Sequence, residues 1–177
     1  MKTEIILIRH GQANTGAQDE ESYDRLSDTG HQQANWLGEY LRGHGEEFDQ
    51  VICGSLRRHR ETASGLDLPH DVAIDPRVNE MRYFDLAHEY HTQTQTPVPN
   101  STEEFAQQIP HLLTAWQSGS LDNAHISYMD FAQQCADVMS ELAIQGGRSL
   151  IVTSVGVIGM AIAQPLALGP AGFSRLM

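Results

Sequence analysis

The apolar run Ile5-Ile6-Leu7-Ile8, close to the start of the chain, constrains the fold more than any other feature. Consecutive apolar residues without alternation predict a strand, Thr3–Arg9, that is covered on both faces, because a half-exposed strand would alternate with polar residues. Such strands belong to parallel sheets that carry helices on either side. Arg9-His10-Gly11 follows directly, so we expect it at the carboxyl end of the strand, where open parallel sheets bind ligands.

The rest of the chain alternates strand patterns with helix patterns, which predicts a three-layer α/β/α sandwich around a mostly parallel sheet. The expected strands are 50–53, 72–74 and 148–153, and the expected helices are 30–42, 57–65, 101–116, 128–145 and 157–168. Ser101 with Glu104 predicts a capping box for the third of these helices. The polar segments 12–28 and 82–99 are expected to be loops, the second inserted beside the site.

Length, charge and cysteine content bound the class of protein. A chain of 177 residues predicts one domain over 1–177, with an inserted loop and helical region at about 82–120. The formal net charge of −12 argues against a nucleic-acid partner and against an anionic membrane surface. No leader or membrane-spanning pattern is seen, and Cys53 and Cys135 lie inside predicted elements, so we expect a cytoplasmic protein with reduced thiols.

Arg9-His10-Gly11 suits phosphoryl transfer. The imidazole can attack phosphorus, the guanidinium can form bidentate hydrogen bonds with phosphate oxygens, and glycine lets the backbone approach the phosphate closely. The nine histidines show neither CxxC nor HExxH spacing, so the sequence predicts no metal site. The triplet alone is too short to identify a site, so the interpretation depends on the other residues that could lie near it.

Two further features can complete such a site. The basic cluster Arg57-Arg58-His59-Arg60 opens a predicted helix, and it is either a solvated face or a phosphate clamp at a helix N-terminus with one arginine pointing inward. Glu80 follows the third predicted strand, and it is either a surface residue or a general acid for the leaving oxygen.

Together these residues resemble the histidine phosphatase superfamily, the phosphoglycerate-mutase-like proteins, over roughly residues 3–168. The resemblance is carried by Arg9-His10-Gly11, by Arg58 before Thr62-Ala63, by Leu26-Ser27 with Gly30 and by Glu80, and Gln12-Ala13 with the run 23–27 is most similar to a bacterial subgroup of small phosphatase-like proteins. It implies that His10 is phosphorylated, that Arg9 and Arg58 hold the phosphoryl oxygens and that Glu80 donates the proton. It also implies a small phosphorylated partner and no cofactor or metal, because arginines supply the positive charge.

The chain departs from the family where the second catalytic histidine is expected. Ser154 occupies that position, and Val155 stands where the first glycine usually follows. Serine offers one neutral, shorter-reaching hydrogen bond to phosphate, and the loss of a transition-state donor typically costs about 10²–10³ in rate. No other histidine is near in the sequence, so His59 or His125 would have to reach in from elsewhere.

Two smaller departures concern the phosphate loop and the end of the chain. Gly16 stands where relatives often have an asparagine that touches phosphate, so Asn14 or Thr15 is expected to substitute. Relatives generally continue into a closing edge strand, which this chain lacks before it ends at Met177. An uncovered sheet edge invites pairing with another chain, which favours a homodimer.

Two functions follow from the sequence. The first is a phosphohydrolase that acts on a phosphomonoester through a phosphohistidine at His10, weakened by Ser154. Hydrolysis is preferred to mutase action because the loop after Gly11 lacks a strong match to the mutase version. The second is a degenerate relative that binds phosphate-bearing ligands without useful turnover. The substrate is left open; aromatic and histidine side chains in 82–99 either line the entrance or pack that segment onto the domain.

Overall fold

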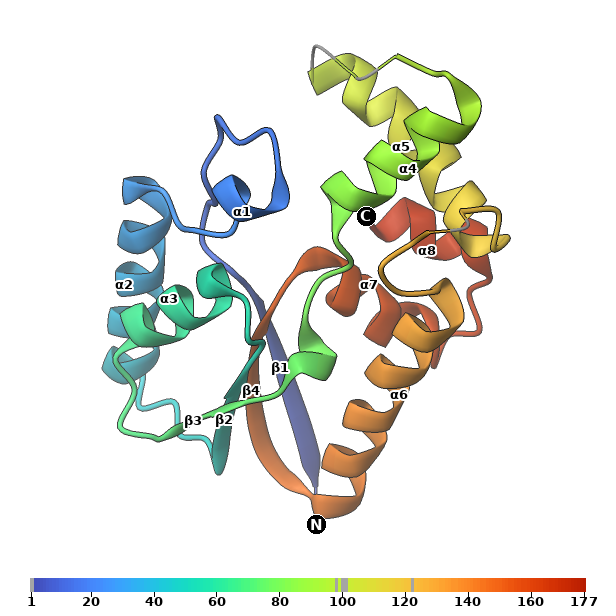
Figure 1. Cartoon of the computed structure of the whole chain (residues 1–177). Coiled ribbons are helices and arrows are strands. Elements are labelled where there is room, and N and C mark those ends of the chain that lie inside the picture. Colours follow the sequence, from blue (N-terminus) through green and yellow to red (C-terminus); the bar gives the residue numbers. More distant parts are fainter. Residues whose placement is uncertain (1, 98, 100–101, 122) are drawn as a thin grey trace.

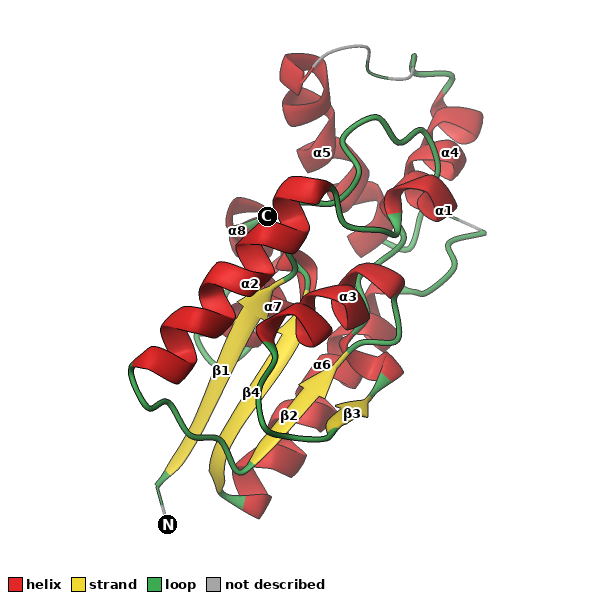
Figure 2. Cartoon of the chain, turned by 90° about the vertical axis from the view of Figure 1, so that its left-hand side faces the viewer, coloured by secondary structure: helices red, strands yellow, loops and turns green. Residues whose placement is uncertain are grey.

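The computed structural model describes residues 2–97, 99, 102–121 and 123–177. Within them, four strands form one parallel sheet in the order β1-β4-β2-β3 (Figure 2). The strands are β1 (Thr3–Arg9), β2 (Gln50–Cys53), β3 (Val72–Ile74) and β4 (Gly147–Thr153). All four positions predicted for strands are therefore confirmed, and β1 and β3 lie at the two edges.

The register brings three strand ends together. Arg9 pairs with Thr153 and Val152 with Cys53, so β1, β4 and β2 end at the same level of the sheet. The His10 N–H donates to the Thr153 carbonyl at 2.8 Å, which extends the β1–β4 ladder by one residue. His10, Gly54 and Ser154 therefore follow adjacent strands at one edge of the sheet.

Helices cover both faces of the sheet, which confirms the three-layer prediction (Figure 1). α2 (Asp28–Gly43) and α3 (Arg57–Leu66) lie on one face, and α6 (Tyr128–Gln145) and α7 (Val155–Ala163) on the other. The β1 side chains divide between the two layers: Ile6 and Ile8 pack on the α2–α3 side, and Ile5 and Leu7 on the opposite side. This division explains why β1 reads as continuously apolar.

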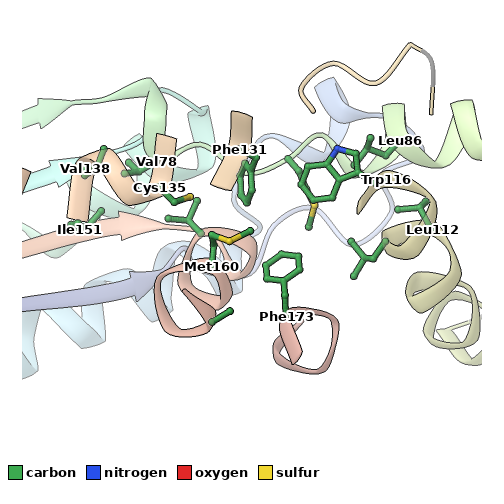
Figure 3. Close-up of a cluster of buried hydrophobic side chains, with 14 of the residues drawn as sticks. Val78, Leu86, Leu112, Trp116, Phe131, Cys135, Val138, Ile151, Met160 and Phe173 are labelled. Atoms are coloured by element: carbon green, nitrogen blue, oxygen red, sulfur yellow. The ribbon is translucent and has the colours of Figure 1, made fainter. Parts of the chain in front are cut away.

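A group of helices stands beyond the carboxyl ends of the strands: α4 (Tyr83–Thr94), α5 (Thr102–Gln117) and α8 (Pro170–Leu176). Figure 3 shows how the main core extends into this group, with Trp116 of α5 and Phe173 of α8 facing Phe131 of α6. The rings of Trp116 and Phe131 lie 5.5 Å apart, and the indole N–H donates to the Ile126 carbonyl at 2.8 Å. The buried polar atom of this tryptophan is therefore paired.

Two segments expected to be loops contain helices. The prediction of a loop over 82–99 is wrong, because α4 occupies 83–94 and buries Leu86 and Ala87 while Tyr90 packs on the same core. That apolar face is short, and the Thr- and Gln-rich sequence behind it hides the pattern. The short α1 (Glu20–Tyr23) lies within 12–28, and its N-cap Asp19 accepts a hydrogen bond from the Ser22 N–H at 2.7 Å.

The predicted helix ends also need correction. α7 spans Val155–Ala163 rather than 157–168, because Pro165 lacks an N–H and Ala167 adopts a positive φ of 50°, which turns the chain into the unpredicted α8. α5 continues through Pro110, and α6 ends at Gly146 as expected. The capping box at Ser101 lies outside the described residues. Among the described residues, no helix is both long enough and apolar enough to cross a membrane.

Candidate active site

His10, directly after β1, is held in one tautomer. Its ring is buried, and Nδ1 lies 2.7 Å from the Gly11 carbonyl, which can only accept. Nδ1 therefore carries the proton and Nε2 keeps a free lone pair. Burial, with smaller contributions from Arg58 and Arg9, lowers the pKa of His10 to about 4, against the hydrogen bond to Gly11, which raises it. The ring is neutral near pH 7, which a nucleophile requires.

Gly11 brings the segment that carries His10 against α2. A Cβ at this residue would lie 2.4 Å from the Gly30 carbonyl oxygen, so only glycine fits without moving the backbone. The Gly11 N–H donates to the Thr62 hydroxyl of α3 at 3.0 Å. The glycine of the triplet therefore serves the contact between this segment and two helices.

Arg58 is held from a distant segment. It lies in the first turn of α3, its side chain is 2% exposed, and its Nη1 is 3.0 Å from Oδ1 of Asp24. The same carboxylate accepts the backbone N–H groups of Arg57 at 2.8 Å and Arg58 at 3.1 Å. α3 has no side-chain cap of its own at Leu56, so Asp24 caps the helix and fixes the guanidinium together.

The basic cluster divides into two inward and two outward side chains. Arg58 and His59 are buried, whereas Arg57 and Arg60 are exposed. The guanidinium of Arg58 lies 5.0 Å from the centre of the Tyr23 ring, and its Nε is buried without a partner among the described residues. A fixed, partly unsatisfied cation whose charge acts on His10 is the arrangement expected of a phosphate clamp.

Arg9 and Glu80 complete the polar surroundings of His10. Arg9 is exposed and forms no ion pair within the described part of the chain, and its charge lowers the pKa of both His10 and Glu80. Glu80 accepts hydrogen bonds from the N–H groups of Gly156 at 3.0 Å and Met81 at 3.1 Å. Burial nevertheless raises its pKa to about 7, so a good fraction of this carboxyl is protonated at neutral pH. That value suits a general acid.

Ser154 contacts an imidazole after all. It is 1% exposed and precedes α7 without capping it, and its Oγ lies 2.7 Å from Nε2 of His59. The ring of His59 is fully buried, 5.7 Å from the ring of His10 between centroids. Burial, reinforced by Arg58 and His10, lowers the pKa of His59 to about 2, so it is neutral. His125 lines a pocket together with Glu80.

Asn14 is engaged in its own loop. Its amide nitrogen donates to the Ser22 carbonyl at 2.8 Å, and its Oδ1 accepts from the Gly16 N–H at 3.4 Å. Thr15 is exposed. A contact of Asn14 with phosphate stays a prediction.

The sequence interpretation missed the role of Asp24 and left His59 as a remote alternative. Asp24 lies in the run 23–27 that carries part of the family resemblance, but its partner Arg58 is on another element and no spacing rule connects the two residues. His59 was visible as part of the basic cluster, and helical geometry places it about 100° around α3 from Arg58.

Comparisons with known proteins identify the family to which the chain belongs. A model of the histidine phosphatase superfamily (branch 1) matches residues 5–177. The adenosylcobalamin/alpha-ribazole phosphatase of Salmonella typhi is 29% identical over 173 residues, which cover 93% of this chain and 80% of that protein.

Solved structures share the fold. A putative alpha-ribazole-5'-P phosphatase from Escherichia coli K-12 superposes with a TM-score of 0.67 at 23% identity, covering 99% of this chain and 85% of the other. A phosphoserine phosphatase from Entamoeba histolytica, solved with 3-phosphoglyceric acid, gives a TM-score of 0.64 at 20% identity over 99% and 85% of the two chains.

Proposed function

The chain belongs to the histidine phosphatase superfamily (branch 1), and on that premise we propose that it hydrolyses a small phosphomonoester through a phosphohistidine at His10. The observation that carries the proposal is the tautomer of His10. With Nδ1–H given to the Gly11 carbonyl, Nε2 keeps its lone pair, and the positive charge of the buried Arg58 acts on the same ring.

In the first step, Nε2 of His10 attacks phosphorus, and the bond from phosphorus to the ester oxygen breaks. Arg9 and Arg58 hold the phosphoryl oxygens, because both charges act on His10. The protonated carboxyl of Glu80 gives its proton to the leaving oxygen, for which a pKa of about 7 is well placed.

In the second step, water attacks phosphorus and the P–N bond breaks. The Glu80 carboxylate takes a proton from that water, so inorganic phosphate leaves and both His10 and Glu80 return to their starting states. Water is the only co-substrate of the two steps, and neither step changes an oxidation state.

The names of the relatives direct the choice of substrates. We propose α-ribazole 5'-phosphate as the first compound to assay, because the Salmonella and E. coli proteins bear that activity in their names. Phosphoserine and 3-phosphoglycerate are the comparison compounds, since they appear in the names of the Entamoeba structures.

The test is phosphate release from p-nitrophenyl phosphate and from these compounds by the native protein and by His10→Ala. His44→Ala is the matched control, because His44 is an exposed histidine at the end of α2. We expect His10→Ala to remove turnover and His44→Ala to keep it. Native-like turnover by His10→Ala would contradict the proposal, and trapping of phosphate on His10 after acid-free denaturation would support it.

Ser154 favours a second candidate, a relative that binds phosphate-bearing ligands without useful turnover. This alternative predicts that the native protein binds orthovanadate or phosphate, whereas its turnover does not exceed that of His10→Ala.

A further inference from the structure

His59 and Ser154 form a buried pair that the family pattern does not describe. Their residues are 95 positions apart, yet Nε2 of His59 lies 2.7 Å from Oγ of Ser154. Both side chains are at most 1% exposed, and the His59 ring is 5.7 Å from the ring of the nucleophile. A histidine from α3 therefore lies at the strand end where the family resemblance leads us to expect one that follows the strand itself.

The surroundings of His59 decide which nitrogen carries its proton. Nδ1 has no hydrogen-bond partner among the described residues, and it faces Gly54, where a Cβ would lie only 2.2 Å from it. A proton on Nδ1 would thus be a buried donor without an acceptor, which is a costly arrangement. A proton on Nε2 has an acceptor in the Ser154 hydroxyl.

In this tautomer, His59 donates to Oγ of Ser154 and leaves the hydroxyl proton free. No other hydrogen bond of this hydroxyl occurs within the described residues, and Ser154 does not cap α7. Ser154 directly follows Thr153, whose carbonyl accepts the N–H of His10, so the hydroxyl belongs to the strand end next to the nucleophile.

We propose that the His59–Ser154 pair replaces the missing second histidine: Ser154 donates a hydrogen bond to the phosphoryl group, and His59 orients the hydroxyl that does so. This inference rests on the phosphatase activity proposed above. Ser154 is then a catalytic residue because it touches the reacting group, and His59 is a positioning residue because it acts through Ser154.

The packing also explains why the serine is small. A histidine at 154 would extend its ring from the position of Oγ, where Nε2 of His59 already lies 2.7 Å away. His59 cannot retreat, because Gly54 already lies against its Nδ1 side. The two positions therefore hold one imidazole between them, and a second ring requires that His59 be shortened.

The experiment compares four variants by kcat and KM with p-nitrophenyl phosphate. Ser154→Ala removes the donor, and His59→Leu fills the space of the ring without donating. His59→Gln keeps an N–H that can reach Oγ, and the fourth variant combines His59→Leu with Ser154→Ala. Thermal unfolding of each variant confirms that it is folded, and inhibition by orthovanadate measures binding of an oxyanion independently of turnover.

We expect kcat to fall about 10²-fold in Ser154→Ala and about tenfold in His59→Leu, with KM changed by less than about threefold. The double variant should be no slower than Ser154→Ala, because the two residues act as one unit. His59→Gln should recover most of the loss. Orthovanadate affinity should follow the same order, since an oxyanion would accept the same hydrogen bond.

The proposal is overturned if His59→Leu keeps native kcat and native orthovanadate affinity, or if His59→Gln is as impaired as His59→Leu. It is also overturned if Ser154→His alone raises turnover. The combination of His59→Ala with Ser154→His should instead work at least as well as the native pair. Failure of the phosphatase proposal looks different: the native protein would be no faster than His10→Ala, and orthovanadate binding would still test the pair.

Discussion

Asp24 offers the sharpest test of how this site is built, because one carboxylate serves two purposes. It neutralises the guanidinium of Arg58 at 3.0 Å and accepts the first N–H groups of α3. Removing it in Asp24→Ala leaves a cation whose side chain is only 2% exposed without its partner. Breaking a buried pair costs about 3–5 kcal/mol. The Asp24 side chain is 24% exposed, so water screens part of that cost and about 2–3 kcal/mol is the better figure.

The lost cap adds to this cost. An N-cap side chain contributes about 1 kcal/mol, so Asp24→Ala should lower the free energy of unfolding by about 3–4 kcal/mol. Asp24→Asn keeps a neutral acceptor for the helix and should lose about 2 kcal/mol. Because the guanidinium is no longer fixed, kcat/KM should fall at least about tenfold in both variants.

Urea unfolding at pH 7 and phosphate release measure the two effects. The decisive comparison adds Arg58→Leu to Asp24→Ala: with no buried charge left, the double variant should be more stable than Asp24→Ala alone. Asp19→Ala is the control, because Asp19 caps α1 in the same loop and contacts no arginine among the described residues. An unfolding free energy for Asp24→Ala within about 0.5 kcal/mol of native would refute the reasoning.

Three further predictions concern the titrating groups. The carboxyl of Glu80 loses its proton above its pKa of about 7, so kcat should fall at alkaline pH. Glu80→Gln should lower kcat by about 10²–10⁴ for substrates with poor leaving groups, and a pH–rate profile of the native protein and the variant tests both expectations. Gly156→Ala puts a Cβ 2.0 Å from the Glu80 carboxylate, so kcat should fall while the unfolding free energy, measured in urea, stays near native. In the folded protein the pKa values of His10 and His59 are lowered to about 4 and about 2, so as pH falls below 6.5 the unfolded chain binds these protons first and the free energy of unfolding decreases. Between pH 6.5 and 5.0, the free energy of unfolding of His59→Gln should therefore decrease by about 1.5 kcal/mol less than that of the native protein, as urea unfolding at the two pH values can measure.

The strands and the layers could be predicted because burial on both faces leaves a strong trace in the sequence. Ile5–Ile8 are apolar without interruption, and the structure shows that alternate side chains enter the two cores. α4 could not be predicted in the same way. α4 buries Leu86 and Ala87, with Tyr83 and Tyr90 packed on the same core, and its last turn is as polar as a loop. Its position is fixed by contacts with α5, which local sequence does not encode.

The same distinction, between features that local sequence encodes and contacts that only the fold creates, applies to the residues of the site. His10, Arg58 and Glu80 were predicted from motifs, because each follows a strand end or opens a helix, and the shared charge effects on their pKa values indicate that they lie near one another. What motifs could not supply were the partners of these residues. Asp24 reaches Arg58 across 34 positions and His59 reaches Ser154 across 95, and only the parallel topology brings those segments together.

The position of an imidazole in space is a different property from its position in a motif. In the sequence, Ser154 stands where a histidine is expected. In the structure, an imidazole does lie near His10, but it is that of His59 from α3. The exchange also changes the charge, because burial, reinforced by Arg58, lowers the pKa of His59 and keeps the ring uncharged. Under the proposed function, the pair supplies a hydrogen-bond donor but no positive charge, and the cationic stabilisation of the phosphoryl group then comes from Arg9 and Arg58. If the native protein is slower than its relatives, the difference should therefore be electrostatic in origin. Substitution of Arg9 or Arg58 should accordingly lower kcat more than substitution of His59 or Ser154 does.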